Sequence, residues 1–221
     1  MLTEKETIKG EAIFNDERTH RFVLRRTWNK SKPQAMVVML NPCDADSVIC
    51  DTTTFLVINN IARLEEFGGV TIVNLFSLLT SKLSFKWSPD EELNLPENDD
   101  YIKKAVEESS KVILAWGRAV DTNRRIEERA MHVLNLLLPY REKLFLIFDG
   151  DRVGLHPLTP AIRNRWILEH FDEASERIKQ KKQEKLNQAK VAEKLIPMEV
   201  DVRELEQEGE ANEETITEIQ K

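Results

Sequence analysis

The chain carries the sequence AMVVML at residues 35–40, an unbroken apolar run that leads directly into Asn41 and Pro42. Three similar runs follow it: VTIVNLF at 70–76, KVILAWG at 111–117 and KLFLIFD at 143–149. An apolar run without alternation is typical of a strand that helices cover on both faces. The four runs therefore predict an α/β fold with a central, mainly parallel four-stranded sheet.

Segments with helical character separate these runs, at residues 52–67, 98–110 and 121–140. The last of them repeats apolar residues at helical spacing, which predicts an amphipathic helix. Helices that connect parallel strands pack on the faces of the sheet. We therefore expect a three-layer α/β/α sandwich.

The sequence ahead of the first run predicts an N-terminal β-hairpin. Its turn is Asn15-Asp16-Glu17, and the residues after the turn alternate between apolar and charged. We expect Phe22 and Leu24 to face the core, and Arg21 and Arg25 to face solvent.

The C-terminal part has a different composition. Residues 161–195 contain no Gly or Pro and predict one long helix that ends near Leu195. The sequence beyond Pro197 has low hydrophobicity and one dominant sign of charge, as flexible segments have. The predicted organisation is an α/β/α domain at 1–175, a charged helical extension at 176–197 and an acidic flexible tail at 198–221.

The charge is distributed unevenly along the chain. The formal net charge is −7, and residues 199–221 account for all of it with nine acidic and two basic residues. Residues 1–198 hold 30 basic and 30 acidic residues, so the body is neutral. The overall acidity therefore does not exclude a nucleic-acid partner.

Several classes of protein are excluded by composition. No apolar run approaches the roughly 18 residues that a membrane span needs, and the N-terminus has no signal-peptide pattern. Cys43 and Cys50 are the two cysteines, and the four histidines have no paired metal-ligand spacing, which excludes disulfide scaffolds, zinc fingers and four-cysteine clusters. We expect a cytoplasmic monomer that uses no metal and no organic cofactor.

Polar residues follow the predicted strands at the points where ligands bind in open parallel sheets. The first strand leads into Asn41-Pro42-Cys43-Asp44, and the second carries Asn74 near its end. The third ends in Trp116-Gly117, and the fourth leads to His156-Pro157-Leu158. Two amides and a histidine should therefore lie on one rim of the sheet.

These motifs resemble the uracil-DNA glycosylase superfamily, in the branch with Asn-Pro after the first strand. They also resemble a bacterial family of unknown function and of that general type. The resemblance spans about residues 35–175, and its motifs are MLNPxxAD (39–46), DxT (51–53), VNLF (73–76), ND (98–99), AWG (115–117) and HPL (156–158).

The resemblance implies a role for each matching residue. Asn41 would handle the attacking water, and Asn74 would read the pyrimidine edge, because an amide offers one donor and one acceptor side by side. His156 would stabilise the negative charge that develops on the departing base. Leu158 would fill the gap that the extruded base leaves in the stack. Pro42, Cys43 and Phe55 would border the base.

Two arginines after the HPL motif are candidate phosphate contacts. Arg163 and Arg165 lie at the expected start of the long helix, where guanidinium groups and helix N–H groups can hold phosphate. The implied partner is single- or double-stranded DNA containing uracil. An acidic, DNA-mimicking inhibitor protein could bind the same surface.

The sequence also departs from the efficient glycosylases, which have an aspartate where Asn41 lies. An amide can orient water but cannot act as a base, which implies slow or altered chemistry. Asp44, Asp46 or Asp51 could supply a carboxylate, although loop and helix-cap roles are the ordinary ones for such residues. Two alternatives therefore stay open: a nucleic-acid or nucleotide binding module without catalysis, and a nucleoside or nucleotide hydrolase.

The tail generates the first prediction. Truncation after Pro197 should leave DNA affinity equal or higher, because it removes the whole net charge of −7. Any gain should shrink as salt rises, since exposed charges are screened over about 8 to 10 Å. The measurement is the DNA affinity of both chains at low and moderate salt, and weaker binding after truncation would contradict the expectation.

Overall fold

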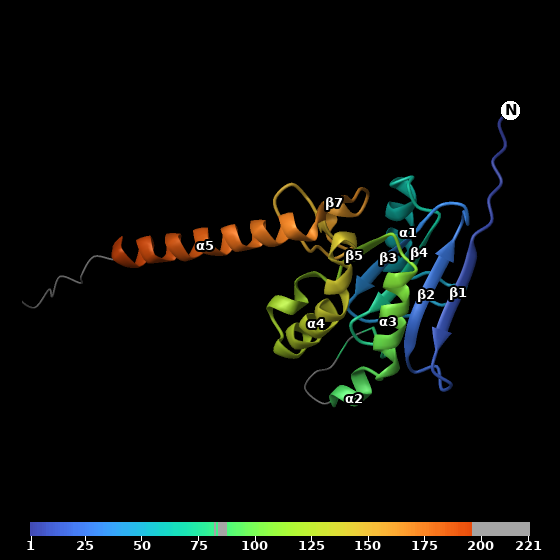
Figure 1. Cartoon of the computed structure of the whole chain (residues 1–221), viewed down its shortest axis with the longest axis horizontal. Helices are drawn as coiled ribbons and strands as arrows, with labels where there is room; N and C mark the ends of the chain where they lie inside the picture. Colours follow the sequence, from blue (N-terminus) through green and yellow to red (C-terminus); the bar gives the residue numbers. More distant parts are fainter. Residues whose placement is uncertain (82, 84–87, 196–221) are drawn as a thin grey trace, which may run out of the picture. The chain divides into compact units, whose positions relative to one another are not determined.

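The computed structural model describes residues 1–81, 83 and 88–195 (Figure 1). The fold is α/β, as predicted, and is built on one mixed seven-stranded sheet with the order β1-β2-β4-β3-β5-β6-β7. The strands are β1 (Lys9–Phe14), β2 (Arg21–Thr27), β3 (Gln34–Met39), β4 (Gly69–Asn74), β5 (Lys111–Leu114), β6 (Leu144–Phe148) and β7 (Ile167–His170). The α-helices are α1 (Thr52–Arg63), α2 (Asp90–Leu93), α3 (Glu97–Glu107), α4 (Arg124–Leu137) and α5 (Phe171–Leu195).

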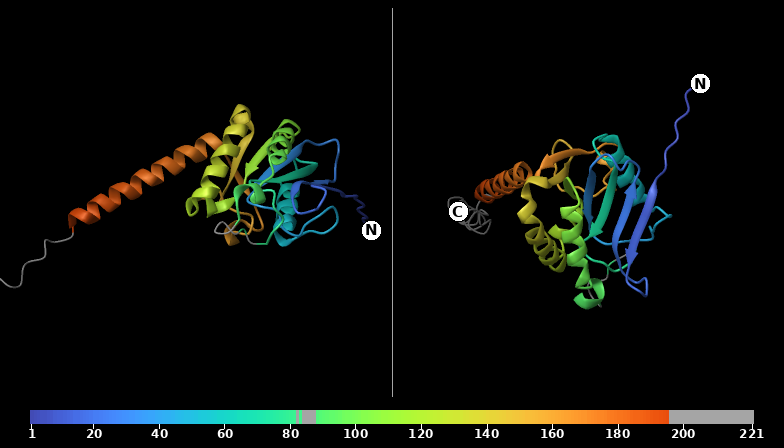
Figure 2. Two further views of the ribbon diagram at one scale, coloured as in Figure 1. Left: turned by 90° about the horizontal axis from the view of Figure 1, so that it is seen from below. Right: turned by 45° about the vertical axis from the view of Figure 1, so that its right-hand side comes forward.

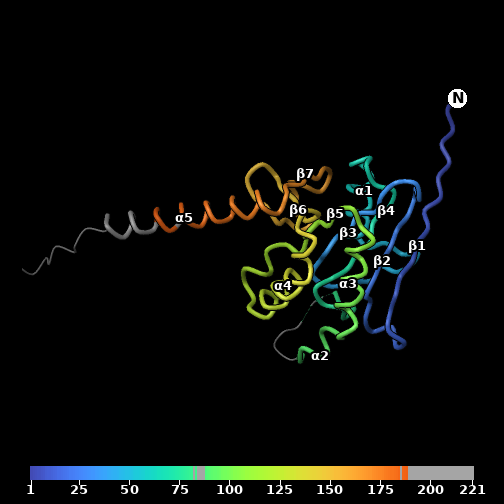
Figure 3. The backbone as a smooth tube through the Cα atoms, in the orientation of Figure 1, coloured from blue at the N-terminus to red at the C-terminus, as the bar shows by residue number. Residues whose placement is uncertain are grey.

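The four strands expected from the apolar runs are β3, β4, β5 and β6. β3 pairs in parallel with β4 on one side and with β5 on the other, and β5 pairs in parallel with β6. Antiparallel strands extend the sheet at both ends, with β1 and β2 beyond β4 and β7 beyond β6. Figure 3 follows the chain through these strands.

Helices cover the two faces of the sheet. Apolar residues of α3 and α4 share one buried cluster with β3, β4 and β5, and residues of α1 share a second cluster with the opposite side of the same strands. Figure 2 shows α3 and α4 on one side of the sheet and α1 on the other. β3 therefore lies between two cores, and its residues from Ala35 to Val38 have no exposed surface.

The hairpin prediction is confirmed, but one of its details is wrong. β1 and β2 pair in antiparallel register on either side of the predicted turn. Phe22 and Leu24 are buried as expected, whereas Arg21 is also buried, with 1% of its surface exposed. The alternation rule failed there because the side chain bonds to backbone carbonyls under a loop and does not reach solvent.

The prediction of one helix over residues 161–195 is also wrong at its start. A short 3₁₀ helix at Pro160–Ile162 and the strand β7 precede α5, which begins at Phe171. β7 covers the open edge of β6, and pairing with that edge outweighs the local helical preference. Arg163 and Arg165 therefore lie in a loop and not at a helix N-terminus.

The chain divides into two units, Met1–Glu176 and Arg177–Lys221. α5 extends to Leu195, which is the last residue that the structure describes. The predicted tail at 198–221 lies outside the described residues. Among the helices that the structure describes, none is long and apolar enough to cross a membrane.

Candidate functional site

The candidate site lies at what we call the carboxyl edge, the rim formed by the segments that follow β3, β4, β5 and β6. The chain leaves β3 toward α1 on one face, and it leaves β4 and β5 toward α3 and α4 on the other. In open α/β sheets, ligands bind beyond the carboxyl ends of neighbouring strands whose connections diverge in this way.

Asn41 joins two segments of the carboxyl edge. Its Nδ2 donates to Thr80 O at 2.7 Å and to Pro42 O at 3.1 Å, and Thr80 N donates to Pro42 O at 3.1 Å. These carbonyl partners fix the orientation of the amide. Within the described part of the chain, Asn41 Oδ1 has no hydrogen-bond partner, so an acceptor remains available while the donor has a structural role.

Two arginines of β2 donate hydrogen bonds to backbone carbonyls of the β3 loop (residues 41–51). Arg21 Nη1 donates to the carbonyls of Ala45 and Cys43, the latter at 3.4 Å. Arg26 Nη2 donates to Asp46 O at 2.6 Å and to Ile49 O at 3.4 Å. Both arginines are buried, and burial lowers the pKa of Arg21 to about 10. The loop that follows the Asn-Pro motif is therefore fixed along most of its length.

The acidic residues of the β3 loop have structural roles. Asp51 caps α1 by accepting from Thr54 N at 2.7 Å. Asp46 Oδ1 accepts from Val48 N and Ile49 N, both at 2.8 Å, and these backbone bonds lower the pKa of Asp46. Asp44 is exposed. Two of the three carboxylates therefore have the cap and loop roles that the sequence favours.

Asn74 has a buried amide without partners. Only 1% of its surface is exposed, and neither Nδ2 nor Oδ1 has a hydrogen-bond partner among the described residues. It pairs across the sheet with Met39, whose side chain belongs to the core on the α1 face. Because paired residues of neighbouring strands face the same side, the Asn74 amide lies on that side of the carboxyl edge, toward the β3 loop.

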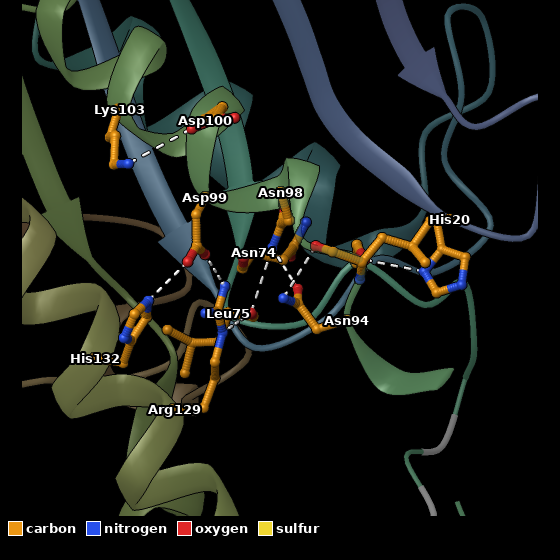
Figure 4. A network of polar contacts seen from close by, with 12 residues as sticks. His20, Asn74, Leu75, Asn94, Asn98, Asp99, Asp100, Lys103, Arg129 and His132 are labelled. Carbon is orange, nitrogen blue, oxygen red and sulfur yellow. Dashed lines mark hydrogen bonds and ion pairs between the residues drawn. The ribbon is translucent and has the colours of Figure 1, made fainter. Parts of the chain in front are cut away.

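The backbone at Asn74 is held firmly even though its side chain is not. Asn98 Nδ2 donates to Asn74 O at 3.1 Å and to Leu75 O at 3.4 Å, and Arg129 Nε donates to Leu75 O at 2.7 Å (Figure 4). Asp99 in turn accepts from Arg129 Nη2 and lies 2.7 Å from His132 Nε2. The ND motif thus links α3 and α4 to the residue that presents the free amide.

His156 packs against the end of the neighbouring strand. Gly117 has a φ of +75°, and a Cβ at this position would lie 2.8 Å from His156 Cβ. Only glycine therefore allows this approach, which brings the AWG and HPL motifs into contact. Leu158 N donates to His156 Nδ1 at 3.2 Å, so the ring proton is on Nε2. Burial lowers the pKa of His156, which keeps the ring neutral at neutral pH.

The remaining predicted residues are spread over a wider area. Leu158 is 38% exposed at the tip of its loop, and Arg163 Nε donates to its carbonyl at 2.8 Å. Phe55 is 57% exposed on the first turn of α1. Pro42 is buried and Cys43 is half-buried. Arg165 lines a separate cleft beside α1 and β7.

Sequence reasoning missed the polar groups beneath this edge. Arg21 was expected on a solvated strand face together with Arg25, no face was predicted for Arg26, and no local pattern distinguishes the two buried arginines from Arg25. His20 is also buried, and its Nδ1 lies 2.9 Å from Ser77 Oγ in the segment after β4. Three arginines in one seven-residue strand, at positions 21, 25 and 26, are the one signal that could have raised the question.

Two open clefts lie elsewhere on the first unit. One has a volume of about 280 Å³ near the start of β1 and β4, and the other has about 540 Å³ beside α1 and β7. Neither is lined by Asn41, Asn74 or His156. In the part of the chain that the structure describes, no group of three or more His, Cys, Asp or Glu residues could hold a metal ion.

The fold and the carboxyl edge define an α/β protein whose polar side chains gather beyond the ends of its parallel strands. The chain belongs to the family described as "Protein of unknown function (DUF1643)", whose model matches residues 21–158. That span begins at Arg21, includes Asn41 and Asn74, and ends just past His156. No significant match was found among curated proteins or among solved structures.

The support beneath the β3 loop generates the second prediction. Arg21→Met should lower the free energy of unfolding by about 1–3 kcal/mol, because two buried carbonyls lose their donor. Hydrogen exchange at Asp46 N, which bonds to Ile49 O, should become faster. Arg124→Met is the matched control, since its side chain is exposed on α4 and its loss should cost less than about 0.5 kcal/mol. Unchanged exchange in Arg21→Met would show that the arginine does not hold the loop.

Proposed function

We propose that this protein is a DNA glycosylase that excises uracil. It binds DNA, takes one pyrimidine nucleotide out of the strand and hydrolyses its N-glycosidic bond. The observation that carries the proposal is the buried, unpartnered amide of Asn74, on the same edge as a neutral His156. The motif order resembles that of the uracil-DNA glycosylase superfamily, and helices on both faces of the β4-β3-β5-β6 strands agree with the three-layer α/β/α arrangement of such enzymes.

Asn74 accounts for recognition of the base. Its Oδ1 accepts from the uracil N3–H, and its Nδ2 donates to the neighbouring carbonyl oxygen. Cytosine presents an amine at that carbonyl position, so it would leave the amide donor unpaired in a buried site, which costs about 1–3 kcal/mol. Asn98 and Arg129 stabilise the backbone from which this amide projects.

His156 accounts for stabilisation of the leaving base. In the reaction the bond from the sugar C1′ to the base nitrogen breaks and its electron pair goes to the base. A water oxygen then bonds to C1′, and the proton that this water loses passes through solvent to the departing base anion. The Nε2–H donor of a neutral imidazole can bond to the base oxygen on which this charge gathers. The hydrogen bond from Leu158 N to Nδ1 sets the required tautomer.

Asn41 accounts for a slow reaction. Its Oδ1 can accept a hydrogen bond from the attacking water, but an amide takes no proton at neutral pH. Its Nδ2 bonds to Thr80 O and gives no help to the substrate. This structural role also favours the binding module without catalysis as the second candidate. The nucleoside hydrolase alternative has less support, because Asp51 caps α1 and Asp46 accepts from backbone N–H groups of its own loop.

The third prediction is uracil release itself. Excess enzyme should generate abasic sites in single- or double-stranded oligonucleotides that contain uracil, detected by alkaline cleavage on a gel. EDTA should leave the rate unchanged, since the proposed roles belong to side chains of this chain. If oligonucleotides bind but no abasic product forms over long times, the binding module replaces the glycosylase.

The fourth prediction separates the two roles. His156→Ala should slow single-turnover cleavage more than it weakens DNA binding, because its interaction strengthens as charge develops. Asn74→Asp should no longer recognise and excise uracil, whereas Asn135→Asp, on an exposed position of α4, should cleave and bind like the parent protein. Equal losses of rate and affinity in His156→Ala would contradict its assigned role.

The pH dependence of cleavage follows from the same histidine. Burial lowers the pKa of His156 below its ordinary value of 6.5, so cleavage should stay constant as pH falls through 6.5 and should decline only below the lowered pKa. The unfolded chain takes up this proton at a higher pH than the folded protein does. The free energy of unfolding should therefore decrease as pH falls from 6.5 toward the folded pKa of His156.

A further inference from the structure

A cleft on the first unit is separate from the carboxyl edge. We call it the α1–β7 cleft; its volume is about 540 Å³, within the range of small-molecule sites. It lies beside the last turns of α1, the start of β5 and β6, and β7 with the residues before it. Its lining residues include Asn60, Arg63, Glu66, Lys111, Arg165 and Trp166.

The cleft carries an excess of positive charge. Lys111 Nζ donates to both carboxylate oxygens of Glu66, at 2.8 and 3.0 Å, and lies over the ring of Phe145. This pair is neutral overall. Arg63 and Arg165 are exposed, and neither makes an ion pair or a side-chain hydrogen bond with another described residue. Two guanidinium groups are therefore free to hold an anion.

Two buried polar atoms at the cleft also lack partners. Asn60 and Trp166 are almost fully buried, and neither Asn60 Oδ1 nor Trp166 Nε1 has a hydrogen-bond partner among the residues described. Asn60 Nδ2 donates to Leu56 O at 2.9 Å and to Arg163 O at 2.8 Å, which fixes the orientation of the amide. An unpaired buried donor or acceptor costs about 1–3 kcal/mol, and a ligand could supply the missing bond.

We propose that the α1–β7 cleft binds the phosphate of a nucleotide. Arginine suits this ligand because its planar donors match phosphate oxygens in pairs. The indole Nε1–H of Trp166 can add a donor to an anion, and Asn60 Oδ1 can accept from an amine or hydroxyl of the same ligand. The ligand class is therefore an anion that also carries hydrogen-bond donors, as a nucleotide does.

The connection to the Leu158 loop favours a nucleotide within a DNA strand. Asn60 bonds to Arg163 O, and Arg163 bonds to Leu158 O, so the cleft and the loop proposed to enter DNA are joined by one residue. A strand that leaves the Leu158 loop along residues 158–165 reaches Arg165 at the cleft. This DNA source rests on the proposed function, whereas binding of a free nucleotide does not.

The experiment compares Arg63→Glu/Arg165→Glu with the parent protein for three probes. The probes are inorganic phosphate, thymidine 5′-monophosphate and a fluorescent single-stranded oligonucleotide without uracil. Their binding is measured by calorimetry or by fluorescence anisotropy at several salt concentrations. We expect oligonucleotide affinity to fall at least tenfold and the salt slope to fall by about 1.4, since each phosphate contact contributes about 0.7 on single strands. Arg124→Glu, on an exposed part of α4, should change affinity less than twofold.

The probes distinguish the source of the phosphate. Loss of oligonucleotide binding alone assigns the cleft to a DNA strand, and loss of monophosphate binding as well assigns it to nucleotides in general. Trp166→Phe should also weaken binding, because it removes the Nε1 donor and retains an aromatic ring. Unchanged affinity of the double variant for every probe, or no binding by the parent, overturns the inference.

Uracil release by the same proteins separates this inference from the proposed function. If the parent protein binds through Arg63 and Arg165 but releases no uracil, the glycosylase proposal is refuted and the proposal of a phosphate-binding cleft stands. If the double variant binds and cleaves like the parent, the proposal of a phosphate-binding cleft is refuted and the glycosylase proposal stands.

Discussion

The geometry of the carboxyl edge depends on β3, because this strand is hydrogen-bonded on both sides and buried on both faces. Its pairing continues past the strand ends: Leu75 N donates to Met39 O, and Ala115 N donates to Val38 O. The segments after β4 and β5 are therefore in fixed register with the point where Asn41 leaves β3. Asn74 and Ala115 owe their places beside the end of β3 to this ladder.

Polar groups inside this edge are of two kinds, those that hold the frame and those that have no partner. Arg21, Arg26 and Asn98 donate to backbone carbonyls, so their burial is compensated by hydrogen bonds. The side-chain amide of Asn74 has no such compensation, although neighbouring residues hold the backbone from which it projects. Such an arrangement is costly as packing alone, and under the proposed function it preorganises a donor and an acceptor for the base.

The parts that the sequence predicted share one property: a local pattern carries them. Strands β3 to β6 follow from apolar runs, because burial on both faces removes alternation. β7 did not follow, since its four residues read equally well as a helix and its stability comes from the edge of β6. The prediction of an exposed Arg21 failed for a similar reason. Its partners Cys43 and Ala45 are distant in the chain, and the alternation rule assumes that one face of the strand is in solvent. For the candidate site, the motifs predicted that Asn41, Asn74 and His156 follow neighbouring strands, whereas only the fold could show which amide is free.

The distribution of free and occupied groups also bears on the proposed chemistry. The donor of Asn41 and the carboxylates of Asp46 and Asp51 are used for loop structure, so none of them is placed to take a proton from water. Of the groups that remain, Asn74 and the Nε2–H of His156 are suited to the base, and Asn41 Oδ1 can orient water but cannot take its proton. A reaction that passes through an oxocarbenium-like sugar depends more on stabilising the leaving group than on activating water, because bond cleavage precedes attack. Under the proposed function, a site built in this way would cleave at a reduced rate and would bind the base even where the chemistry is slow.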